Sequence, residues 1–99
     1  MTLDEAFEKI DRVVEAAKVQ VKEWDRFSTA RGHCTVSSIE NGIAWLLPDD
    51  GSPMFDAVVT GLLHRKKYAI TYALQMHWLK YKRIASVADL EVWNIIYSY

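Results

Sequence analysis

Apolar residues recur at helical spacing through the first part of the chain. From Leu3 to Trp24 they follow one another at alternating intervals of four and three residues, which is the pattern of an amphipathic helix with a heptad seam. Thr2 and Glu5 have the spacing of a capping box, which marks the start of a helix. We therefore predict one helix over residues 3–28, ending before Gly32. The seam consists of Leu3, Phe7, Ile10, Val14, Ala17, Val21 and Trp24.

The pattern leaves two partners open for this seam. It packs on the rest of its own chain, which gives a monomer, or on a second copy of the same helix, which gives a homodimer. We favour the monomer, because a seam with Ala17 at its centre and Trp24 at its end is not an ideal zipper.

Residues 29–53 contain most of the helix-breaking residues. They include three of the four glycines and both prolines of the chain. Within them, SSIENGIAWLLP has apolar residues at helical spacing and is interpreted as a short helix or a buried segment, although Gly42 disfavours a helix. We predict that this part connects two helical regions.

Helical patterns return after the turn PDDGSP. Ser52 suits an N-cap and Pro53 the first position of a helix that runs to about residue 64. A second helix is predicted over about residues 67–78, and a last helix has Ser86 or Asp89 as its N-cap. A continuous helix over 67–99 stays open, because no Gly or Pro interrupts that range.

The expected fold is therefore all-α and forms one domain. It has a long N-terminal amphipathic helix (residues 1–28), a connecting segment (29–53) and a compact C-terminal helical bundle of helix-turn-helix type (54–99).

The composition is that of an ordinary folded domain. Of the 99 residues, 51% are hydrophobic and 25% are charged, and no apolar run is long enough to cross a membrane. The opening residues MTLDEAFEKI are acidic and amphipathic, unlike a secretory signal, so the cytoplasm is the expected compartment. The lone Cys34 cannot form an internal disulfide, which also fits a reducing compartment.

Charge is unevenly distributed, although the net charge is only −1. Residues 1–50 carry six Lys/Arg and ten Asp/Glu, whereas residues 51–99 carry six and three. No acidic residue lies between Ala57 and Ala88. Basic residues with interleaved aromatics suit a nucleic-acid contact, and the alternative is a solvated helix face. The candidate DNA-binding residues are Arg65, Lys66, Lys67, Trp78, Lys80, Tyr81, Lys82 and Arg83.

Motifs for catalysis and for metal binding are missing from the sequence. It has no nucleophile elbow, no HExxH and no paired carboxylates in an apolar setting. His33 and Cys34 are adjacent and not spaced as metal ligands, and His64 and His77 are thirteen residues apart. We therefore predict a protein that is not an enzyme and uses no metal or other cofactor.

Three segments together resemble a known family. VKEWDRFSTARG, SPMFDAVVTGL and YALQMHWLKYKRIASVADLEVW follow the order of features in the phage late-gene antitermination protein Q family, in the group whose C-terminal part is similar to region 4 of a sigma factor. The last segment resembles that family's helix-turn-helix, although Ser86 stands where Gly is usual and Ala88 where Ser or Thr is usual. The resemblance implies a phage-encoded transcription regulator in the host cytoplasm that contacts DNA and host RNA polymerase.

The last sixteen residues favour an alternative. Asp89 and Glu91 give residues 84–99 a net charge of −2, which opposes approach to phosphate. The alternative is a small all-α phage protein that binds and inhibits a host protein without nucleic-acid contact. Its anchors at the interface would be Trp93, Tyr97 and Tyr99.

Overall fold

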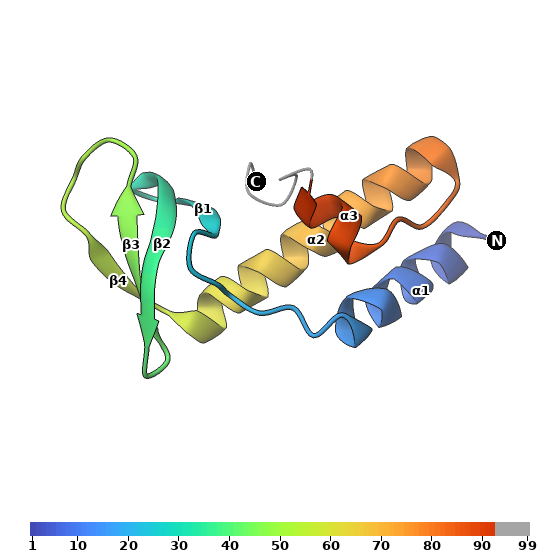
Figure 1. Cartoon of the computed structure of the whole chain (residues 1–99). Coiled ribbons are helices and arrows are strands. Elements are labelled where there is room, and N and C mark those ends of the chain that lie inside the picture. Colours follow the sequence, from blue (N-terminus) through green and yellow to red (C-terminus); the bar gives the residue numbers. More distant parts are fainter. Residues whose placement is uncertain (93–99) are drawn as a thin grey trace. The chain divides into compact units, whose positions relative to one another are not determined.

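The computed structural model describes residues 1–92, with side chains through Asp89. Helices and strands follow one another as Figure 1 shows. The fold is α+β, and the all-α prediction was wrong, because a four-stranded antiparallel sheet lies within residues 26–58. The elements are α1 (Leu3–Ala16), β1 (Arg26–Thr29), β2 (Gly32–Glu40), β3 (Ile43–Pro48), β4 (Phe55–Val58), α2 (Val59–Tyr81) and α3 (Val87–Val92).

The described chain divides into two compact units, here called the sheet unit and the helical unit. The sheet unit is Gln20–Arg65 and holds the four strands and the start of α2. Among the described residues, the helical unit comprises Met1–Val19 and residues 66–92, so it holds α1, the rest of α2 and α3. Each unit has buried apolar residues of its own.

The sheet is an antiparallel meander in which each strand pairs with its neighbour in sequence. Asn41 and Gly42 join β2 to β3 and have positive φ angles of 53° and 77°. The favoured two-residue hairpin turn needs positive φ at both of these positions, and Asn-Gly is the sequence that best provides it. SSIENGIAWLLP is therefore the centre of a β-hairpin, and its interpretation as a short helix was wrong.

One face of the sheet, here called the inner face, packs on the start of α2. Successive residues of a strand point to opposite faces, and in β3 Ala44 and Leu46 are buried while Trp45 between them is exposed. Leu62 from α2 joins the strand residues in one core. The buried members of this core are Phe27, Cys34, Val36, Ala44, Leu46 and Leu62.

Helix α1 is shorter than the helix predicted over residues 3–28. It begins with the predicted capping box, in which the hydroxyl of Thr2 accepts a hydrogen bond from the backbone N–H of Glu5 at 3.2 Å. It ends at Ala16, because Lys18 has a φ of 49°, a left-handed conformation that cannot continue an α-helix. The prediction was wrong beyond that point, and residues 26–29 form β1 instead.

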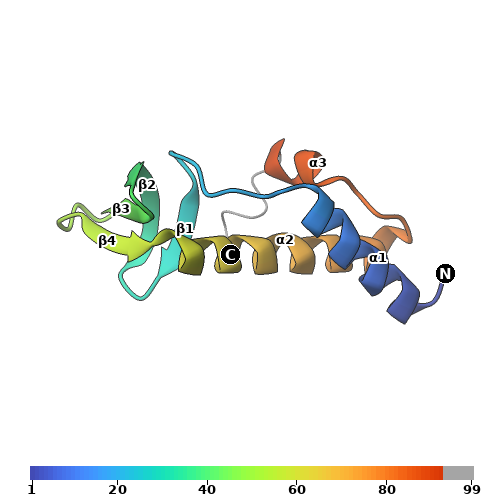
Figure 2. The same cartoon turned by 90° about the horizontal axis from the view of Figure 1, so that it is seen from below.

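The helical unit is built around the C-terminal part of α2. Figures 1 and 2 both show α1 and α3 beside it. Phe7 of α1 and Trp78 of α2 meet edge to face, with ring centroids 6.5 Å apart. The side-chain oxygen of Ser86 accepts a hydrogen bond from the backbone N–H of Asp89 at 3.1 Å, which confirms Ser86 as the N-cap of the last helix.

Helix α2 replaces the two helices that were predicted between residues 54 and 78. Phe55–Val58, expected in the first of them, pairs with β3 as strand β4. From Val59 the helix then runs unbroken to Tyr81. The break predicted near residue 65 was wrong, because His64, Arg65 and Lys66 are all compatible with a helix interior.

Candidate functional site

Both faces of the sheet carry apolar side chains, although only the inner face is buried. Every residue of β3 is apolar. On the face opposite the core, here called the outer face, Trp45 and Leu47 keep 42% and 47% of their surface exposed. An antiparallel sheet with one solvated face normally places polar residues there. The stability of the fold therefore does not explain the exposed apolar side chains on the outer face.

Cross-strand pairing gathers the outer residues into one surface. Trp45 lies between Ser38 of β2 and Asp56 of β4. Ile43, two residues away on β3, lies opposite Val58, which is 57% exposed. Side chains that are opposed across strands, or two residues apart on one strand, are close enough to touch. The resulting outer apolar patch consists of Ile43, Trp45, Leu47 and Val58.

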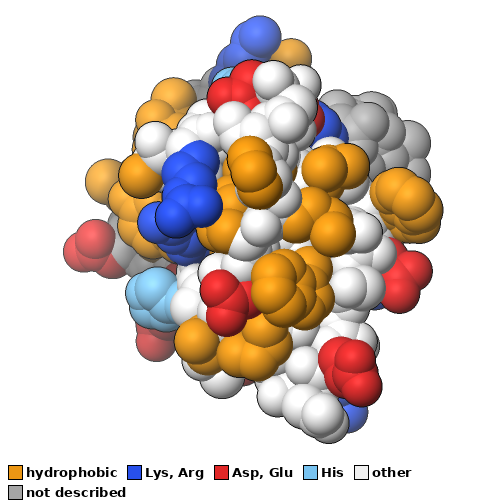
Figure 3. All heavy atoms as spheres, turned by 90° about the vertical axis from the view of Figure 1, so that its left-hand side faces the viewer, with side chains coloured by type: hydrophobic (Ala, Val, Ile, Leu, Met, Phe, Trp, Pro, Cys, Tyr) orange, Lys and Arg blue, Asp and Glu red, His pale blue; other side chains and the backbone are white. Residues whose placement is uncertain are grey.

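Figure 3 shows the face of the molecule that is on the left in Figure 1. Hydrophobic side chains gather across the middle of this view, and both acidic and basic side chains lie next to them. Contiguous exposed apolar surface on a small protein commonly marks a contact site for a partner.

Two acidic side chains border the outer apolar patch. Asp56 lies opposite Trp45, and Glu40 lies opposite Ile43. Both are exposed. Among residues 1–89, neither forms an ion pair with a Lys, Arg or His side chain. The patch therefore has an apolar centre and two acidic side chains at its margin.

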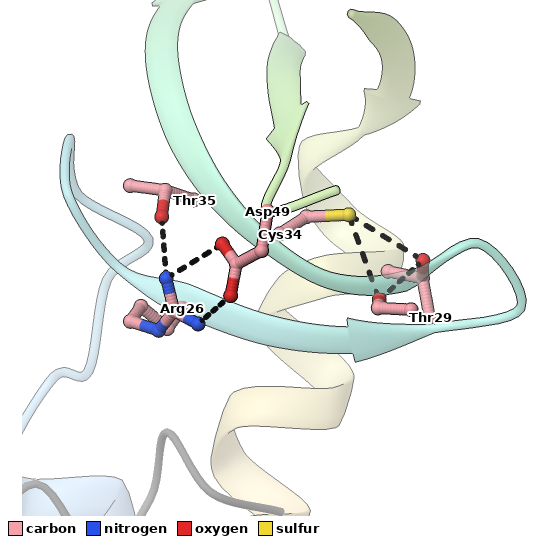
Figure 4. Close-up of polar contacts among 6 residues, drawn as sticks. Arg26, Thr29, Cys34, Thr35 and Asp49 are labelled. Carbon is pink, nitrogen blue, oxygen red and sulfur yellow. Dashed lines mark hydrogen bonds and ion pairs between the residues drawn. The ribbon is translucent and has the colours of Figure 1, made fainter. Parts of the chain in front are cut away.

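An arginine–aspartate pair lies at the same side of the sheet (Figure 4). Arg26 Nη1 donates to Thr35 Oγ1 at 2.9 Å and to Asp49 Oδ1 at 3.0 Å, and its Nη2 donates to the other carboxylate oxygen. The hydrogen bonds from Arg26 lower the pKa of Asp49, and the bond to Asp49 raises the pKa of Arg26. Because the guanidinium of Arg26 is paired with the carboxylate of Asp49, its charge does not neutralise Glu40 or Asp56.

Cys34 lies on the inner face of β2 and is fully buried. Its sulfur lies 3.6 Å from Thr29 Oγ1 and 3.6 Å from the carbonyl oxygen of Gly32 (Figure 4). Within the part of the chain whose side chains are described, no three His, Cys, Asp or Glu side chains come together as a metal site. Cys34 thus belongs to the core of the sheet unit.

The structure does not bring the predicted DNA-binding residues onto one surface. Lys66 and Trp78 are buried, with 3% and 7% of their surface exposed, so neither contributes to an exposed basic strip. Arg65 belongs to the sheet unit, where its Nη1 donates to the carbonyl oxygen of Ser28 at 3.1 Å. Lys67 is half-buried, and residues 80–83 (KYKR) are all exposed.

The predicted partner-binding residues Trp93, Tyr97 and Tyr99 lie outside the described residues. None of the helices within residues 1–92 combines the length and the apolar character needed to cross a membrane.

Sequence reasoning missed the outer apolar patch. A half-exposed strand is normally recognised by alternating polar and apolar residues, and β3 has no polar residue to show the alternation. The available indication was the Asn41-Gly42 pair, which marks a hairpin and therefore a strand on each side of it.

Comparisons with protein-family models, with curated proteins and with solved structures found no match to this chain. What the fold and the site define is a small α+β protein with an uncovered apolar face on its sheet. Its function is inferred from the geometry of these residues.

Proposed function

We propose that this protein acts by binding another protein through the outer apolar patch of its sheet. The observation that carries the proposal is the central strand β3, whose Trp45 and Leu47 are about half exposed in the middle of the sheet. Exposing them costs free energy, because burial of a large apolar side chain is worth about 1.5–3 kcal/mol. A bound partner recovers this free energy. Trp45 is the expected hot spot, since tryptophan dominates such sites.

The charges around the patch specify the partner's chemistry. Glu40 and Asp56 border the patch, and Arg26 is already paired with Asp49. A partner with an apolar surface flanked by Lys or Arg complements this arrangement. A symmetric contact between two copies of this face would bring the acidic margins together, which is unfavourable. The expected partner is therefore a different protein with a basic border around an apolar surface.

This proposal develops the alternative from the sequence, in which the protein binds a host protein. The resemblance to the antitermination protein Q family makes host RNA polymerase the first partner to test. Binding at the patch inhibits or redirects the partner if it covers a surface that the partner uses.

A binding experiment with matched variants tests the proposal. Purified bacterial RNA polymerase, and separately a bacterial lysate, are passed over the immobilised full chain and over two variants. Trp45→Ser removes the centre of the patch. Met76→Ser is the control, because Met76 is 46% exposed but lies on α2 in the helical unit. We expect a retained protein to be lost with Trp45→Ser and kept with Met76→Ser. Retention should also weaken with added salt, because the basic border meets an acidic margin.

Two outcomes contradict the proposal. One is that every protein retained by the unmodified chain is also retained by the Trp45→Ser variant. The other is that the retained protein, once identified, binds equally well when Asp56→Lys reverses the charge beside Trp45. Circular dichroism of each variant shows that the fold is kept.

DNA contact is a second candidate, favoured by the exposure of residues 80–83 (KYKR) at and after the end of α2. Lys80→Glu with Arg83→Glu should abolish retention of a duplex fragment in a gel shift at low salt, because basic contacts to phosphate supply most of such binding. Failure of the unmodified protein to retain DNA at low salt excludes this candidate.

A further inference from the structure

Three basic residues, and no acidic residue, line a pocket in the helical unit within the described part of the chain. It has a volume of about 770 Å³, and α1, the end of α2 and the segment after α2 form its walls. The basic residues are Lys9 from α1 and Lys82 and Arg83 from the segment after α2. The remaining lining residues are mostly apolar, namely Met1, Val13, Trp78, Ile84, Ala85 and Ser86.

We propose that this pocket binds a small organic anion. The anionic group, a phosphate or a carboxylate, is held by Lys9, Lys82 and Arg83, and the apolar body of the ligand packs on Val13 and Ile84. The volume lies within the range of about 300–1,000 Å³ that is usual for small-molecule sites. Bonds from charged donors to an anion are about twice as strong as neutral ones, and the arginine fork matches both anionic groups.

The segment after α2 that carries Lys82 and Arg83 is held in place beside the pocket. Lys82 Nζ lies 4.6 Å from the centroid of the Trp78 ring, and the backbone N–H of Lys82 donates to the carbonyl oxygen of Trp78 at 2.7 Å. His77 Nδ1 lies 3.3 Å from the carbonyl oxygen of Arg83, so a ring N–H there holds the backbone after α2. The Lys82 side chain and the Arg83 backbone are therefore positioned before a ligand arrives, which lowers the entropy cost of binding.

Lys9 forms no ion pair with an acidic side chain among residues 1–89. The acidic residue before it, Glu8, forms an ion pair with Arg12 at 3.5 Å. Glu5, one turn earlier, bonds the hydroxyl of Thr2 at 3.0 Å, and this bond lowers the pKa of Glu5. Among the described residues that line the pocket, none is acidic, so the positive charge has no counter-ion there.

The arrangement favours a small molecule over a nucleic acid. Nucleic-acid backbones are bound by cations spread along an exposed strip or groove, with exposed aromatics for base stacking. Here Lys66 and Trp78, the two buried members of the predicted basic strip, are 3% and 7% exposed. Three cations instead converge on one concave site with apolar walls.

Isothermal titration calorimetry of the full chain tests the proposal with phenyl phosphate and benzoate as probes. Benzyl alcohol is the uncharged control ligand, and a single-stranded oligonucleotide represents nucleic acid. We expect phenyl phosphate, benzoate or both to bind in a one-to-one ratio, and benzyl alcohol not to bind. The two anions distinguish a phosphate ligand from a carboxylate ligand. Lys9→Gln and Arg83→Gln should each lower the affinity for the anion about tenfold or more, because a charge-assisted bond is worth about 1.5–3 kcal/mol.

The matched control variant is Lys18→Gln, which removes an exposed cation from the helical unit without touching the pocket or an ion pair. Its affinity for the probe should equal that of the unmodified chain. The proposal is overturned if neither anion binds, if Lys18→Gln weakens binding as much as Lys9→Gln does, or if only the oligonucleotide binds. These results do not depend on the outer apolar patch, which lies in the other unit.

Discussion

Leu46 and Leu47 are adjacent in β3, identical in chemistry and opposite in environment. Leu46 has 1% of its surface exposed and belongs to the core, whereas Leu47 has 47% exposed on the outer face. Leu46→Ala removes side-chain carbons worth roughly 2.4 kcal/mol at about 0.8 kcal/mol each, and the cavity left behind raises the expected cost to about 2–5 kcal/mol. Leu47→Ala removes the same atoms from a half-exposed position, so it should cost about 1 kcal/mol or less.

Urea unfolding followed by far-UV circular dichroism measures the difference. With a slope of about 1.5 kcal/mol per M, Leu46→Ala should lower the midpoint by roughly 1.3–3.3 M and Leu47→Ala by less than about 0.7 M. Leu47→Ala is the matched control for the loss of a leucine from this strand. Because side chains alternate with a period of two, a pairing register shifted by one residue would exchange the two leucines. Equal losses, or a larger loss for Leu47→Ala, would refute both the register and the outer apolar patch.

Three further predictions concern single side chains. Thr2→Ala should lower the free energy of unfolding by about 1 kcal/mol, because it removes the N-cap of α1; an unchanged urea midpoint would show that this cap does not contribute. The bond from Arg26 lowers the pKa of Asp49 below its ordinary 3.8. The pair therefore stabilises the fold above a pH of 3.8, and this stabilisation is lost as the pH falls through the lowered pKa. Asp49→Asn should therefore remove part of the acid-induced loss of stability in urea titrations at successive pH values, and an identical pH profile would contradict this. Cys34 should react with a thiol reagent only on unfolding, because its side chain is fully buried; rapid labelling of the native protein would contradict the burial.

Capping signals predicted the starts of α1 and α3, but Ser52 and Pro53 precede strand β4 and not a helix. Thr2 with Glu5, and Ser86, mark helix starts through hydrogen bonds to backbone N–H groups a few residues away, so the sequence alone shows them. The end of α1 depends on the left-handed backbone at Lys18, and lysine carries no signal for that conformation. The heptad spacing continued past Lys18 by coincidence, since Val21 packs on the core of the sheet unit and Trp24 is exposed.

The sheet was missed because its central strand has no polar residue. IAWLLP fits a buried helix segment as well as a strand when apolar spacing is the only criterion. Asn41-Gly42 resolves the ambiguity, since two consecutive positive φ angles suit a hairpin and not a helix. Giving turn chemistry precedence over spacing would have predicted β2 and β3, and with them an apolar face on each side of the sheet.

The candidate sites show how far the order of charges along a chain differs from their arrangement in space. Lys66 and Lys82 were predicted to share one basic surface, yet Lys66 is buried and Lys82 lines a pocket. That pocket takes its third cation from Lys9, in the most acidic part of the sequence, where two neighbouring acids are engaged by Thr2 and Arg12. The net charge of a stretch of sequence therefore predicted neither that Lys66 is buried nor that Lys9 of α1 lines the pocket. Both outcomes depend on which helix face packs inward, and only the tertiary structure specifies that.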